Sequence, residues 1–152
     1  MTGLPLIAMT VMLSDPNHKL SRRLPMLYTI LCYNCEDDVH SWTKEQDDEV
    51  MGKLLAVQEK IANRGRLGPV ARLGPTKKAK TLHKDREPFL LTDGPYAETK
   101  EQILGFYVID CDTEDEALEI ARELGHANPG GAFEVRPMIY FQANELRLTP
   151  AM

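Results

Sequence analysis

The chain has 152 residues, which is the size of one ordinary domain and long enough to bury one real core. Its 18 Lys and Arg are scattered among 23 Asp and Glu, the net charge is −5, and no basic run could follow a phosphate backbone. We therefore expect no direct binding to nucleic acid.

The cysteine content and the first apolar stretch bear on the compartment. Cys32, Cys35 and Cys111 are an odd number in a chain whose size requires no covalent crosslinks, which favours a reducing cytoplasm. Residues 3–13 are apolar but too few to span a bilayer, and no basic residues of a secretory signal precede them. A cytoplasmic protein without a membrane partner is expected.

Residues 1–25 differ from the rest of the chain because Pro5, Pro16 and Pro25 interrupt them and no helical or strand period is sustained. We interpret them as a loose N-terminal extension. Residues 26–141 are expected to form the single folded domain, and residues 142–152 a C-terminal tail.

The first elements of the domain have clear patterns. Residues 26–33, MLYTILCY, predict a strand that is apolar on both faces and therefore central in its sheet. Thr43 and Gln46 form a capping box for a helix that ends at Gly65. Its apolar stripe is expected to contain Val50, Met51, Leu54, Leu55, Val57 and Ile61.

The middle of the chain contains weaker and stronger strand signals. Residues 66–84 include two Gly-Pro steps, which favour an interrupted edge strand or a hairpin whose lysines protect the edge. Residues 89–92 predict a short strand that a turn at residues 93–95 closes. Residues 105–110, GFYVID, predict a second strand with two apolar faces, again central.

The last elements complete the pattern. Thr113 and Glu116 form a second capping box, and Gly125 is expected to end that helix. The inward residues are predicted to be Ala117, Leu118, Ile120, Ala121 and Leu124. Residues 133–137 alternate between apolar and charged side chains, which is typical of an edge strand.

The order βαββαβ, with polar outer strands and apolar inner ones, predicts an α+β ferredoxin-like sandwich with strand order 4-1-3-2. Both helices would then cover the same face of the sheet. The opposite apolar face of the two central strands would be left in water in a monomer, so a homodimer with stacked sheets is expected.

The segment TDGPYAETKEQILGFYVIDCD, residues 92–112, followed by DEALEIA and EVRPM, resembles the DGPF-type members of the YCII-related family. The resemblance covers residues 26–139, with Tyr96 where the family name has Phe. It implies a ferredoxin-like fold, often assembled as a dimeric α+β barrel, of unestablished biochemical function.

The resemblance also has functional implications. Many members of the wider family pair a helix His with a loop Asp as a suspected acid/base dyad, but residues 43–63 contain no His and His40 lies before the helix. The dyad therefore cannot be transferred. DGPF-type domains occur beside or fused to sigma-factor-like regions, which implies a link to transcription initiation and a possible sigma-factor-related partner.

The cysteines have the spacing of a CxxC motif, but Cys32 is predicted within a strand rather than at a helix start, where the dipole would lower the thiol pKa. Antiparallel pairing of the two central strands would place Cys111 far from Cys35. We expect three structural cysteines, no metal site and no cofactor, since phosphate loops and metalloprotease helices are also missing from the sequence.

The turn Asp93-Gly94-Pro95 has a structural explanation, because Asp bonds nearby amides, Gly permits positive φ and Pro fixes the next φ. The functional alternative is a small-ligand cleft at the dimer. It would be lined by Asp93, Tyr96, Glu98 and Lys100.

Three classes of function stay open: a small-molecule enzyme with acid/base residues in the dimer cleft, a ligand-binding or regulatory module linked to transcription initiation, and a structural dimer. A buried carboxylate with a raised pKa would favour the enzyme, and an exposed apolar patch the partner-binding module.

Overall fold

The computed structural model describes residues 26–142. The predicted extension at residues 1–25 lies outside them, as does the predicted tail beyond residue 142. One compact unit of the described chain runs as far as Ile139. Within residues 26–142, no helix has both the length and the apolar character needed to cross a membrane.

The main sheet has four antiparallel strands in the order β2-β5-β1-β6. Their bounds are β1 Met26–Asn34, β2 Leu67–Arg72, β5 Gln102–Cys111 and β6 Ala132–Pro137. In terms of these four strands the order is 4-1-3-2, which confirms the prediction that the two doubly apolar segments are central. The mixed α+β architecture is consistent with a ferredoxin-like fold.

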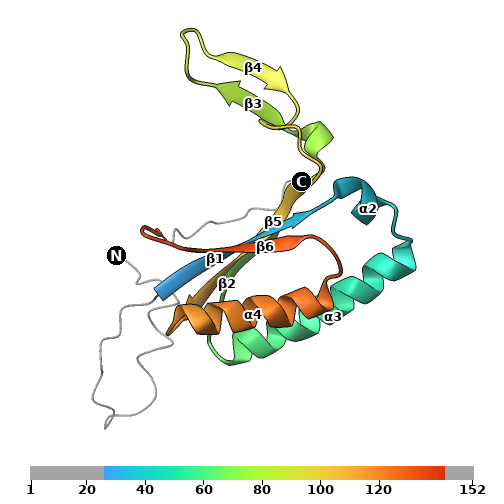
Figure 1. The fold of residues 1–152 in the computed structure, drawn as a ribbon, viewed down its shortest axis with the longest axis vertical. Helices are drawn as coiled ribbons and strands as arrows, with labels where there is room; N and C mark the ends of the chain where they lie inside the picture. Colours follow the sequence, from blue (N-terminus) through green and yellow to red (C-terminus); the bar gives the residue numbers. More distant parts are fainter. Residues whose placement is uncertain (1–25, 143–152) are drawn as a thin grey trace, which may run out of the picture. The chain divides into compact units, whose positions relative to one another are not determined.

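Two long helices, α3 (Lys44–Asn63) and α4 (Glu114–Ala127), lie on the same face of the main sheet, as Figure 1 shows. The core lies between these helices and the sheet. Its largest fully buried side chains are Ile30, Ile61, Ile109, Ile120, Leu124 and Cys111. Two residues predicted to face inward are wrongly assigned: Leu55 is 57% exposed and Leu118 is 37% exposed, since both lie at the margin of their helix stripes.

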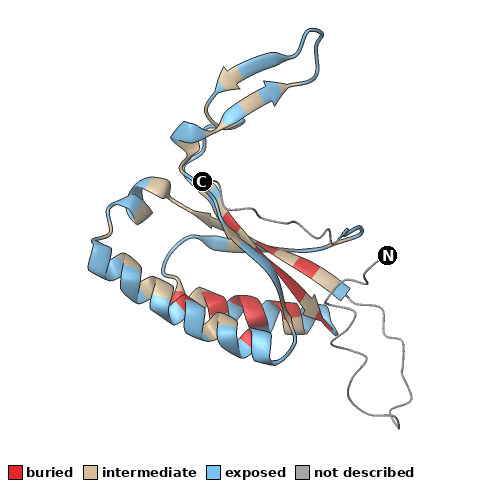
Figure 2. Ribbon diagram, turned by 180° about the vertical axis from the view of Figure 1, so that it is seen from behind, coloured by how far each residue is buried: buried red, intermediate tan, exposed pale blue. Residues whose placement is uncertain are grey.

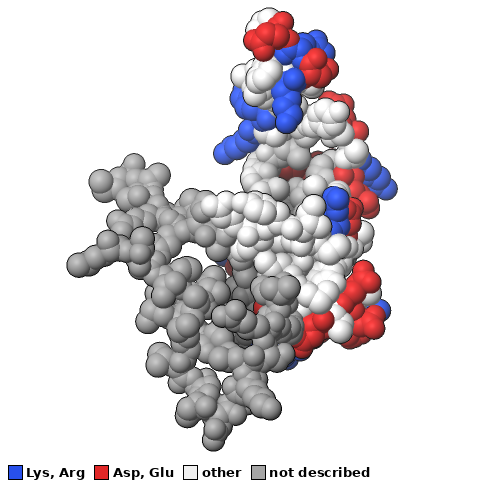
Figure 3. Space-filling view, turned by 90° about the vertical axis from the view of Figure 1, so that its left-hand side faces the viewer, with Lys and Arg blue, Asp and Glu red and all other residues white. Residues whose placement is uncertain are grey.

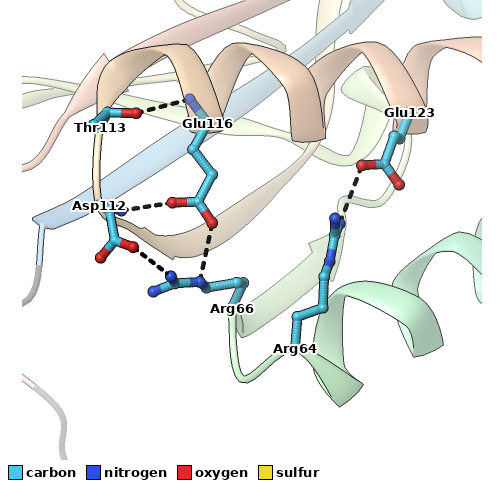
Figure 4. Close-up of polar contacts among 6 residues, drawn as sticks. All are labelled: Arg64, Arg66, Asp112, Thr113, Glu116 and Glu123. Atoms are coloured by element: carbon cyan, nitrogen blue, oxygen red, sulfur yellow. Dashed lines mark hydrogen bonds and ion pairs between the residues drawn. The ribbon is translucent and has the colours of Figure 1, made fainter.

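Both predicted helix starts are confirmed, but their caps differ. Thr43 and Gln46 form the complete reciprocal box at the start of α3. At α4, Thr113 Oγ1 accepts from the Glu116 backbone N–H at 3.2 Å, whereas the Glu116 carboxylate accepts from the Asp112 N–H at 2.7 Å (Figure 4). The second box therefore reaches one residue further back than the sequence pattern predicts.

The end of α4 corrects the sequence analysis. Gly125 was expected to stop this helix, yet the helix continues to Ala127. A Cβ at Gly125 would lie 3.8 Å from the ring of Phe133 in β6. The missing side chain accordingly leaves room between helix and sheet rather than ending the helix.

A short helix that the sequence analysis missed, α2 (Glu36–His40), follows β1. The Glu36 backbone N–H donates to Gln102 Oε1 at 3.1 Å. The Glu36 carboxylate accepts from the Thr76 N–H at 2.8 Å and from the Thr76 hydroxyl, and these bonds hold the pKa of Glu36 below its usual value. Thr76 begins the 3₁₀ helix η1 (Thr76–Lys78).

The segment between β2 and β5 divides into two structures. β2 is an edge strand of the main sheet, whereas β3 (Lys80–His83) and β4 (Leu90–Asp93) form a separate two-stranded antiparallel sheet. The expected edge strand within residues 66–84 is thus present, whereas the hairpin is formed with the separately predicted strand near residues 89–92 and not within residues 66–84. No residue of β3 or β4 is buried (Figure 2).

The sheet face opposite the helices is also apolar at its centre. Strand register puts Leu31 of β1 beside Phe106 of β5, and Thr29 beside Val108. Glu134 and Arg136 of β6 pair with Leu31 and Thr29 and lie on the same face. No helix of the described residues lies on this face (Figure 1), although Val108 at its centre is only 3% exposed.

Candidate functional site

A cavity of about 120 Å³ lies between α3 and the main sheet. Strand β1, the region around α2, helix α3, strands β2 and β5 and one residue after α4 all contribute to its wall. The lining residues are Cys32, Tyr33, Asn34, Val39, Trp42, Asp47, Val50, Met51, Leu54, Gln58, Val70, Ala71, Arg72, Leu104, Gly105, Tyr107 and Asn128.

Two small residues, Cys32 and Gly105, form part of the cavity wall where the sheet passes below α3. Gly105 of β5 pairs with Cys32 of β1, and the register of these strands shifts directly after Cys32. A Cβ at Gly105 would collide with the carbonyl oxygen of Ala71 in β2, so close strand approach requires glycine there. Helix α3 thus covers a glycine and a small thiol instead of two bulky residues.

Three polar side chains of the cavity wall, those of Cys32, Gln58 and Tyr107, are uncharged at neutral pH, and they are here called the inner end. Gln58 Nε2 donates to the Tyr107 hydroxyl oxygen at 3.5 Å, which connects α3 with β5. Burial raises the pKa of the Cys32 thiol to about 12. Burial, followed by the nearby Cys32, also raises the pKa of Tyr107.

These shifts limit the chemistry of the inner wall. A thiol nucleophile acts as the thiolate, which Cys32 does not populate near pH 7. Tyr107 likewise keeps its proton, so it can donate or accept a hydrogen bond without carrying charge. The inner end can therefore recognise a neutral polar group on a ligand.

Charged groups occur towards the surface. Arg72 of β2 and Asp47 of α3 form an ion pair with an N–O distance of 3.3 Å, and their side chains are 56% and 36% exposed. Arg72 Nη1 also lies 3.7 Å from the sulfur of Met51. One carboxylate and one guanidinium thus neutralise each other beside the apolar wall of α3.

The four residues predicted to bind a ligand lie elsewhere. Asp93, Tyr96, Glu98 and Lys100 are all exposed, and none of them lines the cavity under α3. Asp93 forms an ion pair with Lys80. The Tyr96 ring is 83% exposed, with its centroid 6.2 Å from that of His83. A cleft formed by these four residues at a dimer stays a prediction.

The turn after β4 has the backbone that its sequence predicts. Gly94 has φ of +94°, which confirms the expected use of glycine at this position. Its N–H donates to the Ala79 carbonyl at 2.8 Å, and its own carbonyl accepts from the Thr81 hydroxyl at 2.8 Å. The turn is therefore bonded to the start of the hairpin.

The cysteines lie as the strand pattern predicts. Met26 at the start of β1 pairs with Cys111, whereas Cys35 follows the other end of that strand. Cys32 and Cys35 are free thiols. Among residues 26–142, no group of three or more His, Cys, Asp or Glu side chains gathers in a way that could hold a metal ion.

Sequence reasoning missed the functional potential of Gln58, Tyr107 and Arg72. Gln58 and Arg72 lie 49 and 35 residues before Tyr107, a spacing that forms no motif, because α3, β2 and β5 meet only through the fold. The one signal in the sequence was Gly105 inside a strongly apolar strand, since such a glycine often marks close backbone approach.

Comparisons with known proteins identify relatives of this chain. The model of the YCII-related domain matches residues 26–142. An uncharacterised protein of Rhizobium meliloti (strain 1021) is 53% identical over 122 residues, a match that covers 80% of this chain and 98% of that protein.

Proposed function

The chain belongs to the YCII-related domain family, and from the cavity under α3 we propose that it is a ligand-binding module for a small, mainly apolar molecule. The observation that carries the proposal is the uncharged inner end formed by Cys32, Tyr107 and Gln58. Apolar walls with a few converging polar groups are typical of small-molecule sites.

The ionisable groups of the cavity favour binding over acid/base catalysis. General acids and bases work best with a pKa near the operating pH. The pKa of Cys32 is raised far above that range, and Arg72 pairs with Asp47. A carboxylate–imidazole pair is also missing among residues 26–142, because none of the His residues in that range, His40, His83 and His126, lines this cavity.

The cavity size sets the ligand class. A dry cavity of roughly 150 Å³ in another protein accepts benzene, and the volume here is about 120 Å³. One ring of five or six atoms with a single hydroxyl or carbonyl group is therefore the upper size of ligand that we infer for this site. The ring would contact Val50, Met51 and Leu54, and the polar group would replace or share the hydrogen bond between Gln58 and Tyr107.

Phenol is the first probe to use, with amide chemical shifts of the full chain as the readout. We expect saturable shifts in α3 and β5 with a Kd on the order of 1 mM, equivalent to about −4 kcal/mol for seven heavy atoms. Toluene, which lacks the hydroxyl group, should bind more weakly, because it cannot form a hydrogen bond with Gln58 or Tyr107.

Two variants of α3 separate the cavity from general surface binding. Val50→Trp fills the cavity and should abolish the shifts, whereas Leu55→Trp adds the same ring on the exposed side of the helix and should preserve them. Unchanged phenol binding by the Val50→Trp protein, or no shifts at 10 times the expected Kd (about 10 mM), would contradict the proposal.

We also propose that the module is a homodimer whose main sheets stack through the face opposite the helices. Leu27, Leu31 and Phe106 supply apolar surface for that contact. Light scattering should give twice the mass of one chain, and Phe106→Asp should halve it. A monomeric wild-type protein at micromolar concentration would refute the dimer. The link to transcription initiation stays a prediction from the resemblance.

A further inference from the structure

The segment from η1 to β4, residues 76–93, is here called the arm. Among residues 26–142 its two strands pair only with each other, and the other described strands form the four-stranded main sheet. Isolated two-stranded hairpins are marginally stable in water, because one pair of strands cannot bury an apolar face. A contact with another surface would therefore stabilise the arm beyond the hydrogen bonds that hold Thr76 to Glu36.

One face of the arm is suited to such a contact. Leu82 of β3 and Leu91 of β4 are direct cross-strand partners, so their side chains lie on the same face, and they are 55% and 62% exposed. Phe89, just before β4, is 52% exposed. The Lys80–Asp93 ion pair lies at the end of the same face. It is too exposed to add much stability.

The second strand of the arm leads directly to the proposed dimer face. Residues 94–101 connect β4 with β5, which supplies Phe106 to the sheet face opposite the helices. A second copy that packs on this face is available wherever the chain is concentrated enough to dimerise. A twofold contact would also support the arms of both copies, since each surface is used twice.

Charge also favours a second copy. The arm contains five Lys or Arg and three Asp or Glu, although the whole chain has a net charge of −5. Lys78 and Lys84 have no ion pair within residues 26–142. The rest of the domain, residues 26–75 and 94–142, is here called the body. In Figure 3 its acidic side chains, with a few basic ones between them, lie along the right-hand edge of an otherwise uncharged face. The first turn of α2 contributes Glu36, Asp37 and Asp38 to the body. The arm of one copy is therefore attracted to the body of another.

We propose that the arm is an intersubunit element: its apolar face, centred on Leu82 and Leu91, docks on a second copy of this chain. The inference depends on the proposed homodimer, but it is independent of ligand binding in the cavity under α3. It assigns the exposed apolar patch to self-association instead of a foreign partner.

Photocrosslinking of the full chain tests the arm directly. Benzoylphenylalanine is placed at position 82 or 91, and position 55 on the outer side of α3 serves as a control with matched exposure. Tagged and untagged chains are mixed at about 50 μM, a concentration in the range where a micromolar dimer is populated, and irradiated. We expect tagged–untagged crosslinks at least 10-fold more abundant from positions 82 and 91 than from position 55.

Each outcome decides between the alternatives. Crosslinks confined to one chain, including any to residues 1–25, would overturn the inference, as would equal yields from all three positions or no crosslinks. Light scattering on the same samples separates the two failures. A dimer without arm crosslinks refutes the arm contact alone, whereas a monomer refutes both it and the homodimer.

Discussion

The body and the arm contain the same local unit, an antiparallel strand pair with apolar cross-strand neighbours, in two energetic settings. In the body, Ile30 pairs with Tyr107 and both are covered by helices. In the arm, Leu82 pairs with Leu91 and both are more than half exposed. The comparison shows that strand patterning specifies pairing, whereas a second layer supplies most of the stabilisation.

The largest expected difference comes from removing one apolar side chain in each region. Ile109→Ala removes a fully buried side chain and should lower the free energy of unfolding by about 2–5 kcal/mol. Leu91→Ala should cost less than about 1 kcal/mol at protein concentrations where the chain is monomeric. Urea denaturation of both variants measures the contrast. Equal losses of unfolding free energy for the two variants in dilute protein would contradict the difference in stabilisation between body and arm.

Two glycines test how closely the body is packed. Gly105→Ala should cost about 1–3 kcal/mol, because the added Cβ collides with the backbone of Ala71. A Cβ added at Gly52 on α3 would meet no atom within 4 Å, so Gly52→Ala should stabilise the helix by roughly 0.5–1 kcal/mol. Thermal unfolding should show opposite shifts in Tm. A neutral Gly105→Ala change would mean that β2 and β5 can separate without cost.

Figure 4 supplies a matched pair of arginines at the helix–sheet junction. Arg66 forms ion pairs with Asp112 at 2.8 Å and Glu116 at 3.0 Å, and its side chain is 21% exposed. Within the described residues Arg64 forms an ion pair with Glu123 alone, and its side chain is 49% exposed. Arg66→Ala should lower the free energy of unfolding by about 1–2 kcal/mol. Arg64→Ala should lower it by a few tenths of 1 kcal/mol. Denaturation in 1 M salt should reduce the smaller effect further. The reverse ranking would contradict the importance of partial burial.

The smallest effects are expected at the turn that follows β4. Gly94→Ala places a side chain at φ of +94° and should cost about 1 kcal/mol. Asp93→Asn removes only an exposed ion pair with Lys80 and should cost less than about 0.5 kcal/mol. Differential scanning calorimetry compares the two. An Asp93→Asn protein that is equally stable yet loses binding to a cleft ligand would favour the functional alternative for Asp93.

Much of the body could be predicted because its signals are local. The doubly apolar segments at residues 26–33 and 105–110 predicted the two central strands, and Thr43 with Gln46 predicted the start of α3. α2 was missed because its acidic sequence has no apolar period and no side-chain cap. Contacts of Glu36 with Gln102 and Thr76, distant in sequence, hold its first residue.

The cavity under α3 was beyond sequence reasoning for a similar reason. Cys32 was correctly expected within a strand, but its neighbour across the sheet, Gly105, could not be assigned without the register. Gln58 and Tyr107 belong to patterns that predict core faces, and those patterns do not show where packing leaves a space. The predicted ligand residues, from Asp93 to Lys100, were chosen from the chemistry of the turn segment. That chemistry does not show which other residues lie around the turn in the fold.

Glu36 also determines how the segment between β2 and β5 can change in length. Its carboxylate bonds to Thr76, the first residue of the arm, and its N–H bonds to Gln102, which follows the arm, so a single residue holds both ends of the segment between them. The segment is thereby a closed loop. The free-energy cost of closing a flexible loop grows only logarithmically with its length, by roughly 0.6 kcal/mol for each doubling. Insertions or deletions near residues 84–88 can therefore accumulate while β2 and β5 keep their register.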